Sequence, residues 1–138
     1  MRLSYPAHFS AQADGTWLVE FPDLPGCFTE GANQSEAAQA ASEALSAWLE
    51  SVLAREVPFC EPSSRPDLVS VEPNGNVAFA FWLRRERQKS GLTLTDVATR
   101  LGVKYQVYQK LENPATANPT LKTLKKLEVV FGQPLVLV

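Results

Sequence analysis

The stretch Leu92–Glu112, LTLTDVATRLGVKYQVYQKLE, decides the fold of the second half of this 138-residue chain. Thr93 is a suitable helix N-cap, because its hydroxyl can accept a hydrogen bond from an unpaired amide, and Asp96 stands in the first turn. Gly102 is expected to end this helix in the left-handed conformation that glycine adopts without strain. The stretch therefore predicts two short helices joined by a tight turn.

Apolar residues at helical spacing predict which side of each helix is buried. The first helix has Val97, Ala98 and Leu101 on one side. In the second helix, Tyr108 and Leu111 are expected to face inward. An ordinary helical hairpin with a solvated polar face would show the same pattern, because short helix pairs are common. The neighbouring segments favour a more specific arrangement.

Two further predicted helices, Val77–Ser90 and Thr120–Phe131, flank the pair. Four consecutive short helices, with the second and third tightly joined, resemble the Cro/C1-type (XRE) repressor domain. The residues that carry this resemblance are Leu92-Thr93, Val97-Ala98, Leu101-Gly102-Val103, Leu111-Glu112 and Leu124. The resemblance implies an all-α helix-turn-helix domain that binds double-stranded operator DNA.

The segment Lys104–Glu112 is expected to be the recognition helix, which lies in the major groove in this motif. Its outward Gln and Lys side chains can contact adenine, guanine or phosphate. Leu94 departs from the family pattern, which often has a phosphate-contacting glutamine there. One module touches few base pairs, so we expect a homodimer or higher homo-oligomer on a roughly palindromic site. The predicted DNA-binding residues are Thr93, Lys104, Tyr105, Gln106, Val107, Gln109 and Lys110.

The net charge of −2 conceals a division between the two halves of the chain. Residues 1–73 hold 3 Lys and Arg against 11 Asp and Glu, giving −8. Residues 74–138 hold 10 against 4, giving +6, which suits a polyanion such as DNA. The acidic half suits a basic partner. Charge sign and hydrophobic period both change near Pro73–Asn76, so we predict one domain over residues 1–73 and another over residues 77–138.

The acidic half alternates apolar and polar residues with the period of β-strands. Pro6 lies inside the first strand and has no amide to donate, so that side of the strand is expected to be an edge. Asn33 is expected to cap a helix that runs to about Ala54. The predicted fold class is an α+β domain, β-β-β-α-β, with one sheet covered by one helix, followed by the all-α domain. The predicted strands are Leu3–Phe9, Trp17–Phe21, Cys27–Glu30 and Asp67–Glu72.

The acidic half also resembles a known family. The pattern is Tyr5-x-Ala7-x-Phe9, then Asp14-Gly15-x-Trp17-x-Val19-x-Phe21-Pro22-Asp23-Leu24-Pro25-Gly26-Cys27-x-Thr29-x-Gly31, then Glu36-Ala37. It is similar to the HicB antitoxin domain of type II HicAB toxin–antitoxin systems. The resemblance implies a partial RNase H-like fold that binds and neutralises a HicA toxin, a small RNA-cleaving protein. Many members of the family also carry a DNA-binding C-terminus and repress their own operon.

The turn around Pro22–Gly26 supplies the candidate toxin contacts. Its apolar residues can belong to the core or form an exposed contact patch, and the sequence leaves both readings open. The candidate toxin-binding residues are Phe21, Asp23, Leu24, Phe28 and Glu30.

Nothing in the sequence points to an enzyme. An RNase H-type site needs carboxylates that converge on two metal ions, one of them in the first strand, and Leu3–Phe9 contains none. We expect no catalytic residue, no metal and no cofactor. Cys27 and Cys60 are too few for a disulfide framework or a zinc set, and are expected to be reduced thiols. The chain shows no leader and no long apolar run, so we expect a cytoplasmic protein of a bacterium or archaeon.

A second hypothesis stays open. In it the chain is a stand-alone transcriptional regulator whose N-terminal domain dimerises or senses a small ligand. A neighbouring gene for a small basic protein would favour the antitoxin over this alternative. The final segment, Pro134–Val138, is apolar and β-prone, and we expect it to form a short paired strand because a bare edge invites aggregation.

Overall fold

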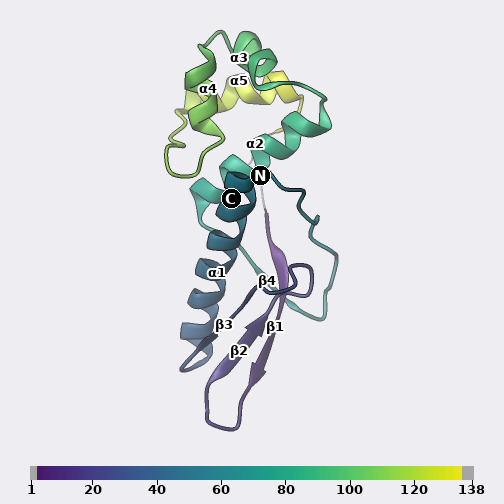
Figure 1. The fold of residues 1–138 in the computed structure, drawn as a ribbon, viewed down its shortest axis with the longest axis vertical. Helices are drawn as coiled ribbons and strands as arrows, with labels where there is room; N and C mark the ends of the chain where they lie inside the picture. The colour runs from purple at the N-terminus through teal and green to yellow at the C-terminus, as the bar shows by residue number, and fades with distance from the viewer. Residues whose placement is uncertain (1–2, 135–138) are drawn as a thin grey trace. The chain divides into compact units, whose positions relative to one another are not determined.

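The structure, a computed structural model, describes residues 3–134. The chain divides into two compact units, which meet between Asn74 and Gly75. Each unit is described by itself below (Figure 1).

The first unit is built on a four-stranded antiparallel sheet, in the order β3-β2-β1-β4. The predicted order of elements, β-β-β-α-β, is confirmed. The Asp14 side chain accepts hydrogen bonds from the amide and hydroxyl of Thr16, which stabilises the hairpin that joins the first two strands. The strands are β1 (Tyr5–Ala11), β2 (Trp17–Glu20), β3 (Phe28–Gly31) and β4 (Val69–Val71).

The first strand changes partner along its length. Tyr5–Ala7 pair with β4, whereas His8–Ala11 pair with β2. Pro6 lies opposite Ser70 of β4, and the register gives it no partner on the β2 side. The missing amide of Pro6 is therefore tolerated, because that side of β1 is an edge at this point, as the sequence predicted.

Helix α1 (Gln34–Arg55) packs against β3, β2 and β4. The Asn33 side chain caps it by accepting a hydrogen bond from the amide of Glu36 at 2.9 Å. The Glu36 carboxylate in turn accepts a hydrogen bond from the amide of Ala32, one residue before the cap. The helix residues buried in this unit are Ala37, Ala41, Leu45, Ser46, Leu49, Val52 and Leu53.

The loop between α1 and β4 is anchored to the strand side of the unit at two points. The Tyr5 hydroxyl donates a hydrogen bond to the carbonyl of Cys60 at 2.7 Å. The Asp23 carboxylate accepts from both the amide and the hydroxyl of Ser63 at 2.8 Å. These bonds give a proline-containing segment without regular structure a defined path.

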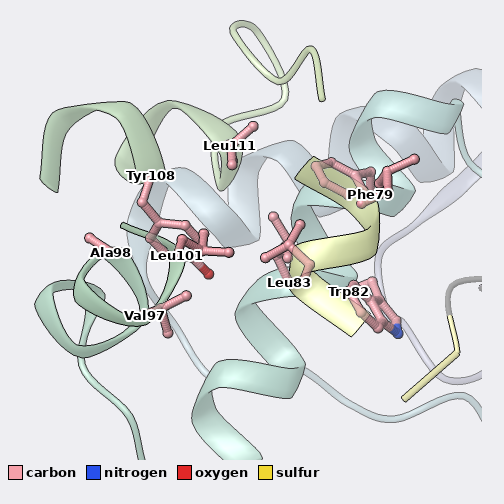
Figure 2. Close-up of a cluster of buried hydrophobic side chains, with 10 residues drawn as sticks. Phe79, Trp82, Leu83, Val97, Ala98, Leu101, Tyr108 and Leu111 are labelled. Carbon is pink, nitrogen blue, oxygen red and sulfur yellow. The ribbon is translucent and has the colours of Figure 1, made fainter. Parts of the chain in front are cut away.

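The second unit is all-helical, and its helices enclose one apolar core (Figure 2). Phe79, Trp82 and Leu83 enter this core from the first helix, and the ring of Trp82 meets Phe131 edge-on at 6.0 Å between centroids. The first helix begins two residues earlier than predicted, and Asn76 in its first turn donates to the carbonyl of Pro114. The predicted strand at Pro134–Val138 lies outside the described residues, apart from Pro134. The helices are α2 (Gly75–Lys89), α3 (Leu94–Leu101), α4 (Tyr105–Leu111) and α5 (Leu121–Phe131).

Candidate functional site

The geometry of the α3–α4 turn follows from its caps. The Thr93 hydroxyl accepts from the amide of Asp96 at 3.1 Å, and the Asp96 carboxylate accepts from the amide of Thr93 at 2.9 Å. These bonds to Thr93 hold the pKa of Asp96 below its usual value. Gly102 ends α3 at φ 72°, and the next amide, that of Val103, donates back to Ala98 at 3.0 Å. The turn is therefore fixed at both ends, and it sets the direction in which α4 leaves α3.

Helix α4 has one buried side and one exposed side. Tyr108 is completely buried and Leu111 nearly so, as the sequence predicted. Two apolar side chains lie on the solvent side, where Tyr105 is 39% and Val107 is 49% exposed. An exposed valine in a short helix among polar neighbours is suited to contact with a thymine methyl group. The polar residues on the exposed side are Lys104, Gln106, Gln109 and Lys110.

The structure gathers most of the predicted DNA-binding residues on this exposed side of α4, with Lys104 as its N-cap. Thr93 lies apart from them, at the start of α3, and its oxygen already accepts the capping bond. Its hydroxyl hydrogen is still available to donate to a phosphate. Leu94 is partly buried against the helical core, so it cannot replace the phosphate-contacting glutamine of the family.

A partly buried ion pair connects the end of α2 to the residue that follows α4. The Nε of Arg87 donates a hydrogen bond to Glu112 Oε2 at 2.7 Å. The Nη2 of Arg87 donates a second one to Glu112 Oε1 at 3.0 Å. A third bond runs from Arg87 to the carbonyl of Leu92, just ahead of α3. One guanidinium thus joins three segments of the helix-turn-helix. Sequence reasoning missed this pair, because the partners are 25 residues apart and no local pattern connects them.

Tyr108 adds a polar atom to the same core. Burial, together with the charge of neighbouring Glu112, raises the pKa of Tyr108 above its usual value. The hydroxyl lies beside both Glu112 and Arg87, so the ion pair and the tyrosine are neighbours in this core. The hydroxyl stays protonated at neutral pH, so the core of this unit carries no tyrosinate charge.

The candidate toxin-binding residues divide between core and surface. Phe21 and Leu24 are 2% and 4% exposed, so their side chains belong to the core and not to a contact patch. Asp23 is half-buried and engaged with Ser63. Phe28, by contrast, is 65% exposed, and Glu30 on the same strand is exposed as well.

Two further observations bear on the kind of site present. Across the part of the chain that the structure describes, no three His, Cys, Asp or Glu residues gather as metal ligands. Within residues 3–134, no helix is both long and apolar enough to cross a membrane.

Comparison with known proteins assigns each half of the chain to a family. Residues 5–82 match the HicB-like antitoxin of bacterial toxin–antitoxin systems. The chain belongs to the HicB-like antitoxin family. Residues 83–138 match a helix-turn-helix family, so this HicB-like protein joins an antitoxin domain to a domain of the DNA-binding type.

One curated protein and one solved structure are each similar to part of the chain. The UPF0150 protein Ta0767 of Thermoplasma acidophilum is 38% identical over 50 residues, which are 36% of this chain and 72% of that protein. A solved HicA3 and HicB3 toxin–antitoxin complex contains a chain with 23% identity and a TM-score of 0.45, covering 52% of this chain and 99% of that one.

The two family matches meet between Trp82 and Leu83, inside α2 of this HicB-like protein. The compact units meet earlier, between Asn74 and Gly75. Phe79 and Trp82 fall within the antitoxin match, although their side chains pack in the core of the helical unit. The family boundary and the structural boundary are therefore eight residues apart.

Proposed function

We propose that this HicB-like protein neutralises a HicA-type toxin by direct binding and represses its own operon by binding operator DNA. The observation that supports the proposal best is the joining of two oppositely charged parts, −8 over residues 1–73 and +6 over residues 74–138. A basic, RNA-cleaving partner suits the first part, and the phosphate backbone of DNA suits the second. Neither part is proposed to be an enzyme.

DNA binding is assigned to α4. Its exposed side chains include two glutamines and two lysines, which together can read adenine, guanine and phosphate. The capped turn and the Arg87–Glu112 pair position α4 before DNA arrives, so little ordering is required on binding. We propose that at least two copies bind one operator, on half-sites about one helical turn apart.

Replacing Gln106 by Ala tests the assignment of the recognition helix. A glutamine that reads adenine through two hydrogen bonds should contribute about 1–3 kcal/mol to discrimination. We therefore expect Gln106→Ala to weaken binding to the cognate operator by about that amount and to relax base preference at one position. Titration of operator and random duplexes, followed by fluorescence anisotropy at a fixed salt concentration, measures both effects.

A matched control is Gln88→Ala, which removes an exposed glutamine from α2. It should bind operator and random DNA as the unaltered protein does. If Gln106→Ala also leaves both affinities unchanged, α4 is not the helix that reads the bases.

A further inference from the structure

Among the described residues of the antitoxin unit, the one helix is α1, and it covers a single face of the sheet. Antiparallel register fixes which side chains share a face, because paired residues point the same way and successive residues alternate. Tyr5, Ala7 and Val19 lie on the face that α1 covers, and each is completely buried. The residues of opposite parity point away from α1; Pro6 among them is buried, and we call the others on β1, β2 and β3 the open face. Its central members are His8, Ser10, Leu18, Glu20, Phe28 and Glu30.

These residues form two rows across three strands. Phe28 of β3 pairs with Glu20 of β2, which pairs with His8 of β1. In the adjacent row, Glu30 pairs with Leu18. Phe28 therefore has one carboxylate directly across from it and another two residues along its own strand.

Phe28 is the conspicuous residue of this face. It is 65% exposed, and in the described part of this unit the other large exposed apolar residue is Val69, at the opposite edge of the sheet. Aromatic side chains are enriched at protein interfaces, because burying one removes much apolar area from water. The carboxylates beside it select a basic partner and disfavour an acidic one.

We propose that the open face is the surface that binds the toxin, with Phe28 as its apolar anchor and Glu20 and Glu30 facing basic residues of the toxin. This inference rests on the proposed antitoxin function and gives it a location. The −8 charge of the first half supplies the long-range attraction that a basic partner experiences, and the open face supplies the contact. Glu20 and Leu18 join the candidate contacts, whereas the buried Phe21 and Leu24 leave them.

The test measures the affinity of the full-length chain for the HicA-type toxin that the proposed function predicts in its operon. Phe28→Ser removes the anchor, and Glu20→Lys/Glu30→Lys reverses the two carboxylates. All three positions are exposed, so the unit should remain folded, which circular dichroism checks. The controls are Val69→Ser, which removes the other exposed apolar side chain, and Glu43→Lys/Glu50→Lys on exposed positions of α1, which changes the net charge by the same amount.

We expect each open-face variant to weaken toxin binding by about tenfold or more, as removal of an interface anchor does, and each control to stay within about twofold. If the open-face variants bind as the unaltered chain does, the toxin docks elsewhere and the antitoxin function stands. Equal losses from the two charge-reversal pairs would mean that overall charge, and not this face, recognises the toxin. If the unaltered chain itself does not bind that toxin, both the location and the proposed function are wrong.

Discussion

Gly31→Ala should unfold the antitoxin unit or leave it barely stable. A Cβ at this position would clash with the amide nitrogen of Ala37 and would lie 2.6 Å from its Cα. Both atoms are backbone in the first turns of α1, so no side chain can rotate away to make room. The strand and helix would have to separate, and since forced overpacking typically costs about 1–3 kcal/mol even where side chains can move, we expect at least the upper end of that range.

The measurement is thermal or urea unfolding of the full-length chain, followed by circular dichroism. Gly75→Ala is the matched control, because a Cβ there meets no atom within 4 Å and the residue begins a helix. It should leave the unfolding midpoint unchanged or raise it slightly, since alanine favours helices. A Gly31→Ala protein as stable as the unaltered one would show that β3 and α1 are not as close as described.

Glu112→Gln should destabilise the helical unit strongly and abolish operator binding. The carboxylate is 9% exposed and receives two hydrogen bonds from Arg87, whose side chain is 16% exposed. Breaking a fully buried ion pair typically costs about 3–5 kcal/mol, and since this pair is partly buried we expect a loss of stability toward the lower end of that range. The affinity for DNA should decrease together with the stability. The reason is that Arg87 also connects the end of α2 to the residue that follows α4 and to Leu92, just before α3.

The exposed pair Arg65–Asp67 provides the control, since its side chains are 46% and 63% exposed. Asp67→Asn should leave the unfolding midpoint essentially unchanged, because exposed pairs are solvated and screened. Replacing both partners, as Arg87→Met/Glu112→Leu, should recover much of the lost stability, because no unpaired charge then remains. A Glu112→Gln protein that unfolds with the unaltered midpoint would contradict the account of this pair.

Sequence patterns predicted the parts of the fold that depend on neighbouring residues. The Thr93 cap, the left-handed Gly102 and the inward Tyr108 follow from spacings of a few residues, and the structure has all three. The alternation in the first strands also predicted the sheet, because a period of two assigns each residue to a face. In these segments, the conformation that neighbouring residues favour is the conformation found in the structure.

Features that depend on distant residues were not predictable in this way. The Arg87–Glu112 pair and the Asp23–Ser63 bond join residues 25 and 40 positions apart. The prediction for β3 began at Cys27, whereas the strand begins at Phe28. The turn before β3 interrupts the alternation, so the pattern could not tell that Phe28 is exposed while Phe21 and Leu24 are buried. Only the register with β2 assigns Phe28 to the open face.

We expect one chain to carry two separable activities, and growth of cells that express the HicA-type toxin predicted in its operon tests this most directly. Those cells receive either the full-length chain or a fragment ending at Asn74, with a reporter under the chain's own promoter. The fragment keeps the bonds from Ser42 to the Glu72 carbonyl and from the Asn74 amide to Ser46, which tie its last residues to α1.

We expect both proteins to restore growth, and we expect the full-length chain to repress the reporter whereas the fragment does not. A folded full-length chain that fails to restore growth would contradict the antitoxin assignment. If that chain still represses the reporter in the same cells, the second hypothesis, a stand-alone transcriptional regulator, would explain the protein instead.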